Sequence, residues 1–324
     1  MRIGSLVVAA LLATGLAAGP ALAQDKASLR LNWLLSGSHG AFVLGKERGY
    51  YKAENIDLTL NEGRGSARSV QQIGSKDDDF AMADAGSLMV GASKGIPAKA
   101  VMSVVNRSTF GIIARKDVGI VTLKDLEGKR LAVTAGDGLT QLWPAVVALN
   151  KLDGDKIRLV MMDATAKTTS FLDKQVDAVL GGITEFPTLF KAKGVDSTVL
   201  AFADHGVNTI GMTVIAHTDT IKAKPDLVKR FVRATQKSYE AMIAEPKEAA
   251  AAVNRLNKDL ELATLLRTVE ESNLVTAAGI PKGKRIGLAP DSEWQLTLDL
   301  MKKYRELETN LPATAFYTNE FLSE

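Results

Sequence analysis

Apolar and polar residues alternate in several short stretches near the start of the chain, and a turn of small residues follows each one. Leu29, Leu31 and Trp33 alternate with polar neighbours, and residues 56–60 repeat the pattern, so both stretches are predicted strands. A helix is predicted over residues 40–48, with Gly49 as its stop. Strand, turn and helix recur three times in under a hundred residues, which favours a parallel, doubly wound α/β sheet.

The same alternation of strands and helices starts again further along the chain. Strands are predicted at residues 101–105, 110–114, 130–134, 157–161, 178–180 and 212–216, and helices at 225–244, 247–257, 260–273 and 292–305. The length suits two domains. We therefore predict a discontinuous lobe 1, residues 24–115 plus 208–324, and a lobe 2, residues 116–207, joined by a hinge of two crossings.

The N-terminus has the three-part pattern of a secretory signal peptide. Arg2 supplies the positive charge, residues 6–18 are apolar, and Ala21 and Ala23 place the cleavage before Gln24. The sequence predicts a signal peptide over residues 1–23. With no cysteine for lipid attachment, a freely soluble periplasmic protein is expected.

Charge and composition exclude several classes of function. The formal net charge is +3 and is spread over segments of mixed sign, which gives no reason to expect a nucleic-acid partner. The chain has no Cys and three His, whose spacing matches no metal-ligand motif. We expect neither a metal site nor a cofactor.

Turns at the carboxyl ends of predicted strands are where ligands bind in open α/β sheets. Gly65 and Ser66 would let a ligand approach the backbone, although Ser66 is equally typical of a helix N-cap. Asp84 could accept hydrogen bonds from an amino group or cap a helix. Trp33 could stack on a planar ligand or fill the core. His39, in a glycine- and serine-rich turn, is expected to be polar and accessible.

The second predicted lobe offers similar turns. Gly138 and Thr140 mirror Gly65 and Ser66, with the same ambiguity between ligand contact and capping. Glu185 follows a strand that ends in two glycines, so its carboxylate could receive ligand N–H groups or remain a solvated surface charge. The pairing of like turns across two lobes favours a ligand site between them.

Several motifs, in order, resemble a known family. The most telling are Leu31-Asn32-Trp33 with Ser38-His39-Gly40, the run at residues 45–51 leading into 55–58, the Gly63 turn, residues 79–84 ending at 95–97, residues 123–133, 176–179 and 225–231. Over essentially the whole chain after residue 23, they resemble the periplasmic binding proteins for sulfonates, taurine, nitrate and thiamine pyrimidine precursors.

The resemblance implies a two-lobed periplasmic-binding-protein fold of the second class, which closes on a small molecule and docks as a monomer on an inner-membrane ATP-driven (ABC) permease. In the pyrimidine-precursor branch an aromatic residue stacks on the ring and acidic residues bind its amino groups, which would give these roles to Trp33, Asp84 and Glu185, with His39 nearby. The sulfonate and nitrate branch would instead use Ser66, Gly138 and Thr140.

An enzyme is the rival interpretation. The same superfamily includes a fungal pyrimidine synthase that uses a cysteine-rich motif and consumes its own histidine. Here Asp84, Glu185 and His39 would be the acid and base groups. The predicted signal peptide and the absence of cysteine favour the non-enzymatic binding protein over the enzyme.

Overall fold

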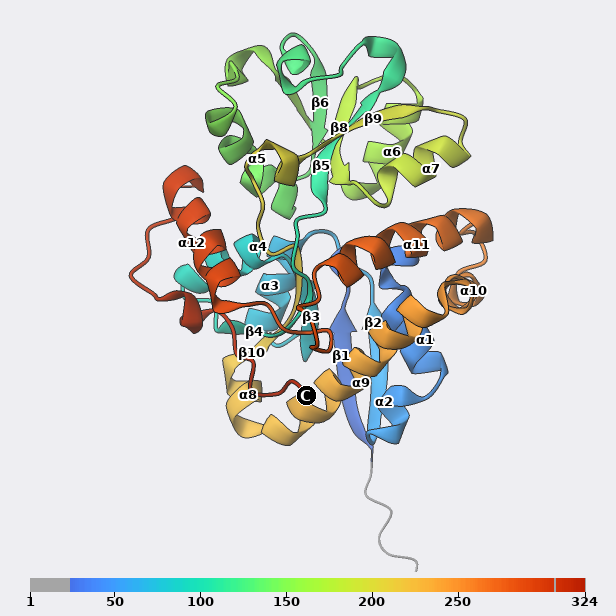
Figure 1. Ribbon diagram of the computed structural model, residues 1–324, viewed down its shortest axis with the longest axis vertical. Coiled ribbons are helices and arrows are strands. Elements are labelled where there is room, and N and C mark those ends of the chain that lie inside the picture. Colours follow the sequence, from blue (N-terminus) through green and yellow to red (C-terminus); the bar gives the residue numbers. More distant parts are fainter. Residues whose placement is uncertain (1–23, 306, 324) are drawn as a thin grey trace, which may run out of the picture.

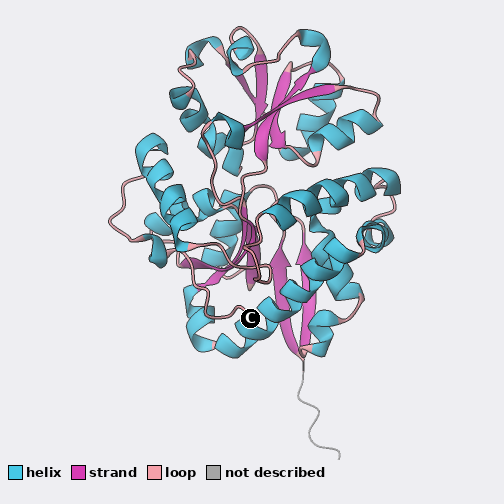
Figure 2. Cartoon of the chain, viewed as in Figure 1, coloured by secondary structure: helices cyan, strands magenta, loops and turns pink. Residues whose placement is uncertain are grey.

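The computed structural model describes residues 24–305 and 307–323, and the predicted signal peptide lies outside them. The strands form two separate five-stranded sheets, each at the centre of its own lobe (Figure 1). Helices cover both faces of each sheet (Figure 2). No helix in the described part of the chain is long and apolar enough to cross a membrane.

The sheet of lobe 1 has the order β2-β1-β3-β10-β4. Its strands are β1 (Asp25–Arg30), β2 (Ile56–Asn61), β3 (Phe80–Ala83), β4 (Ala98–Val105) and β10 (Met212–His217). β1 pairs in parallel with β2 and β3, whereas β10 pairs antiparallel with β3 and β4. The last strand therefore returns from the second lobe to the middle of the first sheet.

The sheet of lobe 2 has the order β7-β6-β8-β5-β9. Its strands are β5 (Phe110–Arg115), β6 (Arg130–Val133), β7 (Arg158–Met161), β8 (Ala178–Gly182) and β9 (Ser197–Ala201). β6 pairs in parallel with β7 and β8, and β5 lies antiparallel between β8 and β9. Both sheets are thus mixed rather than parallel, because each takes in one strand that crosses from the other lobe.

The helices follow the strands in the alternating order that the sequence predicts. In lobe 1 they are α1 (Gly40–Glu47), α2 (Tyr50–Ala53), α3 (Ser66–Gly74), α4 (Ala85–Ser93), α8 (Thr218–Ala223), α9 (Pro225–Ala244), α10 (Pro246–Leu256), α11 (Leu262–Ala278) and α12 (Asp291–Arg305). In lobe 2 they are α5 (Gly138–Leu149), α6 (Ala164–Leu172) and α7 (Phe186–Ala192).

Strand pairing places the boundary between the two lobes earlier in the chain than predicted. Residues 110–115 were expected in lobe 1, but they form β5, which pairs only within the second sheet. The chain therefore crosses between the sheets at residues 106–109 and 202–211. An ion pair between Arg107 and Asp204 (2.8 Å) and a bond from the Ser108 N–H to Asn208 Oδ1 (3.2 Å) join the two crossings.

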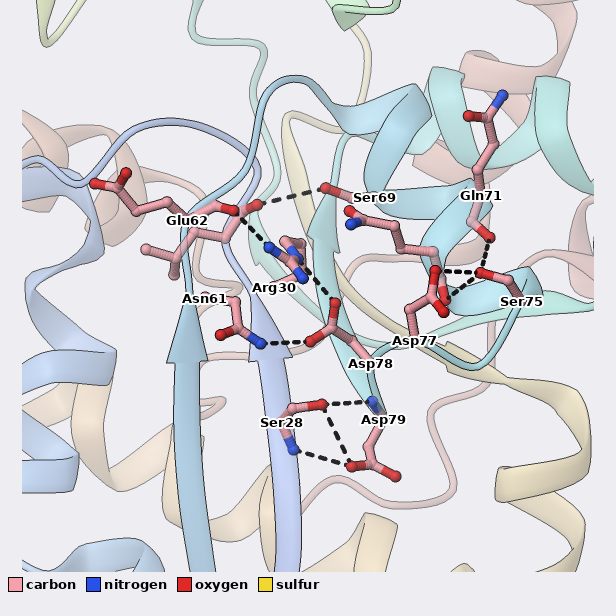
Figure 3. Close-up of polar contacts among 12 residues, drawn as sticks. Ser28, Arg30, Asn61, Glu62, Ser69, Gln71, Ser75, Asp77, Asp78 and Asp79 are labelled. Atoms are coloured by element: carbon pink, nitrogen blue, oxygen red, sulfur yellow. Dashed lines mark hydrogen bonds and ion pairs between the residues drawn. The ribbon is translucent and has the colours of Figure 1, made fainter.

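The loops that leave β1 and β2 are anchored by a buried carboxylate. Asp78, just before β3, accepts from Arg30 Nε (2.8 Å) and from Asn61 Nδ2 (2.7 Å), the last residues of the two neighbouring strands (Figure 3). A buried carboxylate is stable only when it is paired and hydrogen-bonded, as here. The cluster fixes the edge of the sheet from which residues 31–39 and 62–65 depart.

An aromatic core holds the long helix α9 against the first sheet. Phe231 of α9 stacks on Phe80 of β3 with ring centroids 3.8 Å apart, and Tyr51 packs against the Phe231 ring. Burying each of these side chains contributes roughly 2–3 kcal/mol. The helix end that carries Tyr239 is thereby held beside the lobe boundary.

Candidate ligand-binding site

A cavity lies between the two lobes and takes residues from both. We call it the interlobe cavity. Lobe 1 lines it with the loops after β1 and β2 and with α9 and α11, and lobe 2 with the loop after β6, with α6 and with the end of β8. The carboxyl ends of parallel strands therefore meet here, as the fold rule for α/β sheets requires.

Trp33 lies in the loop after β1, which ends at Arg30 rather than continuing to residue 33 as the alternation suggests. The indole lines the interlobe cavity and is not fully buried. The Lys167 ammonium, from α6 of lobe 2, lies 5.4 Å from the centroid of the ring. A cation at this distance interacts favourably with an indole face.

Lys167 and Asp137 form a buried ion pair at the floor of the cavity. Their Nζ and Oδ2 atoms are 2.9 Å apart, and the two side chains are 1% and 2% exposed. Lys167 also donates to the Leu180 carbonyl (2.8 Å), and Asp137 accepts from the Thr140 N–H (2.7 Å). Burial lowers the pKa of Lys167, while the neighbouring Asp137 opposes that shift.

The sequence did not single out Lys167 or Asp137. A signal was available, because the buried positions of α6 are Ala164, Lys167, Ser170 and Phe171, spaced as one face of a helix. A lysine on a buried face requires a carboxylate partner nearby.

Glu185 reaches across the boundary to the loop of lobe 1. Its Oε1 accepts from the Ser38 hydroxyl and from the Ser36 hydroxyl (3.3 Å), and the two serine hydroxyls are 2.8 Å apart. Burial raises the pKa of Glu185, and the two serine bonds oppose the rise. Glu185 lines the cavity, which brings it together with Trp33.

Ser66 and Asp84 bond to each other. The Ser66 hydroxyl oxygen accepts from the Asp84 N–H (3.1 Å), and Ser66 lines the cavity. Asp84 caps α4 by accepting from the Ser87 N–H (2.8 Å) and the Ser87 hydroxyl (2.6 Å). Burial raises the pKa of Asp84. Asp84 is not among the described residues that line the cavity, so its geometry fits the capping role better than a ligand contact.

His39 is 1% exposed, so the expectation of an accessible histidine is wrong. The turn folds inward because its imidazole closes a small polar network. Its Nδ1 accepts from the Ser36 N–H (3.2 Å), and its Nε2 lies 3.1 Å from Asn32 Oδ1. Burial lowers the pKa of His39 to about 4, which keeps the ring neutral at neutral pH.

Gly138 and Thr140 differ in their relation to the cavity. Gly138 lines it, and a Cβ at this position would lie 2.1 Å from Asp84 Oδ2 of the other lobe. The Thr140 hydroxyl donates instead to the Thr134 carbonyl (2.9 Å) within its own loop. Gly138 thus permits the close approach of the lobes, while Thr140 stabilises the turn.

Helices α9 and α11 add three lining residues that could not be identified from the sequence. They are Tyr239, Ser272 and Thr276. The Ser272 hydroxyl is buried without a hydrogen-bond partner among the described residues. Their positions follow the ordinary buried face of an amphipathic helix, which looks the same whether it faces core or cavity.

The charged groups that line the cavity are two carboxylates, Asp137 and Glu185, and one cation, Lys167. Because Lys167 is paired with Asp137, Glu185 is left with hydroxyl donors alone. Within residues 24–305 and 307–323, no group of three His, Asp or Glu side chains is arranged to hold a metal ion.

Comparisons with known proteins agree on the family and the fold. The NMT1/THI5-like family model matches residues 36–249. Riboflavin-binding protein RibY of Chloroflexus aurantiacus is 22% identical over 313 residues, 94% of this chain and 88% of its own. The 4-amino-5-hydroxymethyl-2-methylpyrimidine phosphate synthase of Legionella pneumophila is 22% identical over 306 residues, 93% of each chain.

Among solved structures, the alkanesulfonate-binding protein SsuA from Xanthomonas axonopodis pv. citri, bound to MOPS, superposes with a TM-score of 0.73 at 16% identity, over 92% of this chain and 98% of its own. The two-lobed periplasmic-binding-protein fold predicted from the sequence is thereby confirmed. These three proteins are described as having different ligands or activities. Because the family model covers more than half of the sequence, the chain belongs to the NMT1/THI5-like family.

Proposed function

We propose that this chain is the solute-binding component of an ATP-driven importer and captures a small planar heterocycle that carries N–H donors, such as a pyrimidine-type thiamine precursor. The observation that carries the proposal is Glu185, a carboxylate that lines the interlobe cavity beside Trp33 and has no cation partner among the described residues. Capture would occur by closure of the two lobes about residues 106–109 and 202–211.

Glu185 has one oxygen left for a ligand. Oε1 receives both serine hydroxyls, whereas Oε2 has no partner in the described part of the protein. The Glu185 side chain is half-buried, and a carboxylate that loses water without compensation is unfavourable, which is why desolvation raises its pKa. An amino group or a protonated ring nitrogen on the ligand would supply the missing donor, and Trp33 would stack on the ring.

Anionic ligands fit this cavity less well. Its lining charges sum to one net negative charge, and its single cation already bonds a carboxylate. The Thr140 hydroxyl, a donor expected for a sulfonate or nitrate, is directed to a backbone carbonyl. Sulfonates, nitrate and aromatic carboxylates therefore remain the alternative class, supported by the name of the SsuA neighbour rather than by the charges.

An enzymatic role is supported only by the names of relatives such as the Legionella pneumophila synthase. Acid–base chemistry would require His39, Asp84 and Glu185 to meet the substrate. His39 has both ring nitrogens engaged in hydrogen bonds and Asp84 caps α4, so neither is placed to move a proton in the cavity. Recovery of an unaltered ligand by mass spectrometry after prolonged incubation would support binding, and a changed mass would support an enzyme.

The remaining parts of the proposal follow from the importer role. The chain would be exported by its predicted signal peptide, act in the periplasm as a monomer, and present the closed pair of lobes to an inner-membrane permease. The similarity to RibY and SsuA, which are both described as binding proteins, supports this role.

The test is a thermal-shift screen followed by calorimetry, with 2-methylpyrimidin-4-amine, methanesulfonate and nitrate as probes. A ligand that binds only the folded state must raise the midpoint. We expect the aminopyrimidine alone to do so, and Glu185→Gln to weaken its binding roughly tenfold or more, since a hydrogen bond to a charged group is worth roughly 1.5–3 kcal/mol. Glu270→Gln, at an exposed glutamate, is the matched control. A rise with methanesulfonate or nitrate alone would contradict the proposal.

A further inference from the structure

The tautomer of the buried His39 ring follows from its contact with a backbone N–H group, which can act only as a donor. The Ser36 backbone N–H points at Nδ1 (3.2 Å), and a backbone N–H can only donate. Nδ1 must therefore be the unprotonated nitrogen, and the ring hydrogen lies on Nε2. The pKa of about 4 and the full burial of the ring agree with this neutral form.

The hydrogen on Nε2 in turn determines the orientation of the Asn32 amide. Nε2 lies 3.1 Å from the side chain of Asn32, and since it donates, it must face the amide oxygen Oδ1. The NH₂ group of Asn32 then points elsewhere. Asn32 lines the interlobe cavity, and no described residue accepts from its Nδ2.

The same loop connects this amide to the other ligand contact. Ser36 Oγ lies 3.4 Å from His39 Nδ1 and 2.8 Å from Ser38 Oγ, and Ser38 donates to Glu185. Polar contacts through His39, the N–H and hydroxyl of Ser36, and the Ser38 hydroxyl thus connect Asn32 with Glu185 across the lobe boundary. One end offers a donor to the cavity and the other end an acceptor.

We infer that His39 is a positioning residue that locks the Asn32 amide with its NH₂ group toward the ligand, so that the site selects a ligand with a hydrogen-bond acceptor there. The inference deepens the proposed function and rests on it: the ligand must combine an acceptor for Asn32 with an N–H donor for Glu185. An aminopyrimidine has this arrangement, a ring nitrogen beside an amino group. 3-Methylaniline keeps the amino and methyl groups of 2-methylpyrimidin-4-amine but has C–H in place of each ring nitrogen, so it offers Glu185 a donor and Asn32 no acceptor.

The test compares the dissociation constants of 2-methylpyrimidin-4-amine and 3-methylaniline in matched variants. His39→Asn can keep an oxygen near Nδ1 for the Ser36 N–H but lacks the donor to Asn32. His39→Gln can place an NH₂ group near Nε2 and keep that donor. We expect the native protein to prefer the aminopyrimidine about tenfold or more, because the Asn32 NH₂ group left unpaired by 3-methylaniline costs roughly 1–3 kcal/mol.

In His39→Asn the preference should fall to within about threefold of unity, because the freed amide can turn over, and His39→Gln should restore most of it. A merely structural histidine would weaken both ligands equally in both variants and leave the ratio unchanged, which would overturn the inference. ¹⁵N NMR of the histidine ring supplies a readout without ligand. We expect the Nε2–H tautomer at neutral pH. The Nδ1–H tautomer would overturn the inference, whether or not a pyrimidine binds. Failure of every pyrimidine to bind would instead refute the proposed function.

Discussion

Two helix N-termini, one from each lobe, lie against each other at the interlobe cavity. Asp84 caps α4 by accepting from the N–H three residues on, and Asp137 caps α5 in the same way. Each of these N–H groups belongs to a hydroxyl residue, Ser87 or Thr140. By sequence and by local geometry the two caps are near duplicates.

Their electrostatics differ. Asp137 bonds the Lys167 ammonium, whereas Asp84 is fully buried and has only hydroxyl and backbone donors. Burial and, to a smaller extent, the charge of Asp137 raise the pKa of Asp84, while its hydrogen bonds oppose the rise. A cap motif thus predicts the turn but not the charge environment, because the deciding cation comes from a helix thirty residues away in the chain.

Of the changes considered at the two caps, replacement of Lys167 is expected to have the largest effect on stability. Lys167→Met keeps much of the apolar chain but leaves Asp137 buried without a cation beside Asp84. Removing one partner of a buried pair is expected to lower the free energy of unfolding by about 3–5 kcal/mol. Urea denaturation measures the loss.

Lys174→Met is the matched control, because this lysine is 71% exposed and its pair with Asp117 should contribute under about 1 kcal/mol. The double variant Lys167→Met/Asp137→Asn should recover part of the loss. A loss in Lys167→Met as small as that in Lys174→Met would show that Asp137 does not depend on its cation.

The close approach of the caps can be broken at Gly138. In Gly138→Ala the new Cβ would meet Asp84 Oδ2 at 2.1 Å, although the backbone there does not require glycine. Because an open arrangement avoids the clash, we expect little change in the free energy of unfolding but roughly a tenfold or greater loss of ligand affinity, about 1.4 kcal/mol. Calorimetry and small-angle scattering report the two effects.

Gly154→Ala serves as the control, since its Cβ would meet only Val147 of the same lobe at 3.4 Å. Unchanged affinity in Gly138→Ala would mean that ligand capture does not need this closed arrangement.

The fold could be predicted from the sequence because short, strongly periodic stretches such as residues 56–60 and 225–244 became β2 and α9. Residues 110–115 were assigned to the wrong lobe, since alternation identifies a strand but not its partners. β9, α6 and α7 were missed because short elements without a clear period give little signal.

The site was predictable where a residue follows a strand and not where the tertiary fold supplies it. Trp33, Ser66, Gly138 and Glu185 line the cavity, as expected of loops at strand ends. His39 was misjudged because a turn rich in small residues can fold inward as easily as outward. Lys167 could have been recognised only once α6 was known, as a lysine on a buried helix face, whereas Tyr239 lies on a buried face of α9 that gives no sign of a ligand.

Replacement of Asp84 itself is expected to have the smallest effect on stability. Asn is also a good N-cap, so Asp84→Asn should lower the free energy of unfolding by only about 1 kcal/mol at neutral pH. Asp137→Asn, which leaves Lys167 buried without its partner, should lower it by about 3–5 kcal/mol. Chemical denaturation of the two variants measures the difference, and equal losses would contradict the asymmetry.

The pH dependence should separate the roles further. Because the folded pKa of Asp84 is raised, the folded state binds this proton more tightly than the unfolded state, so the contribution of Asp84 to stability is complete below the unfolded value of 3.8 and is lost as the pH rises through the folded pKa. Asn cannot titrate. The stability of the native protein relative to Asp84→Asn should therefore increase as the pH is lowered toward 3.8, and a difference that is constant with pH would show that burial does not raise the pKa of Asp84.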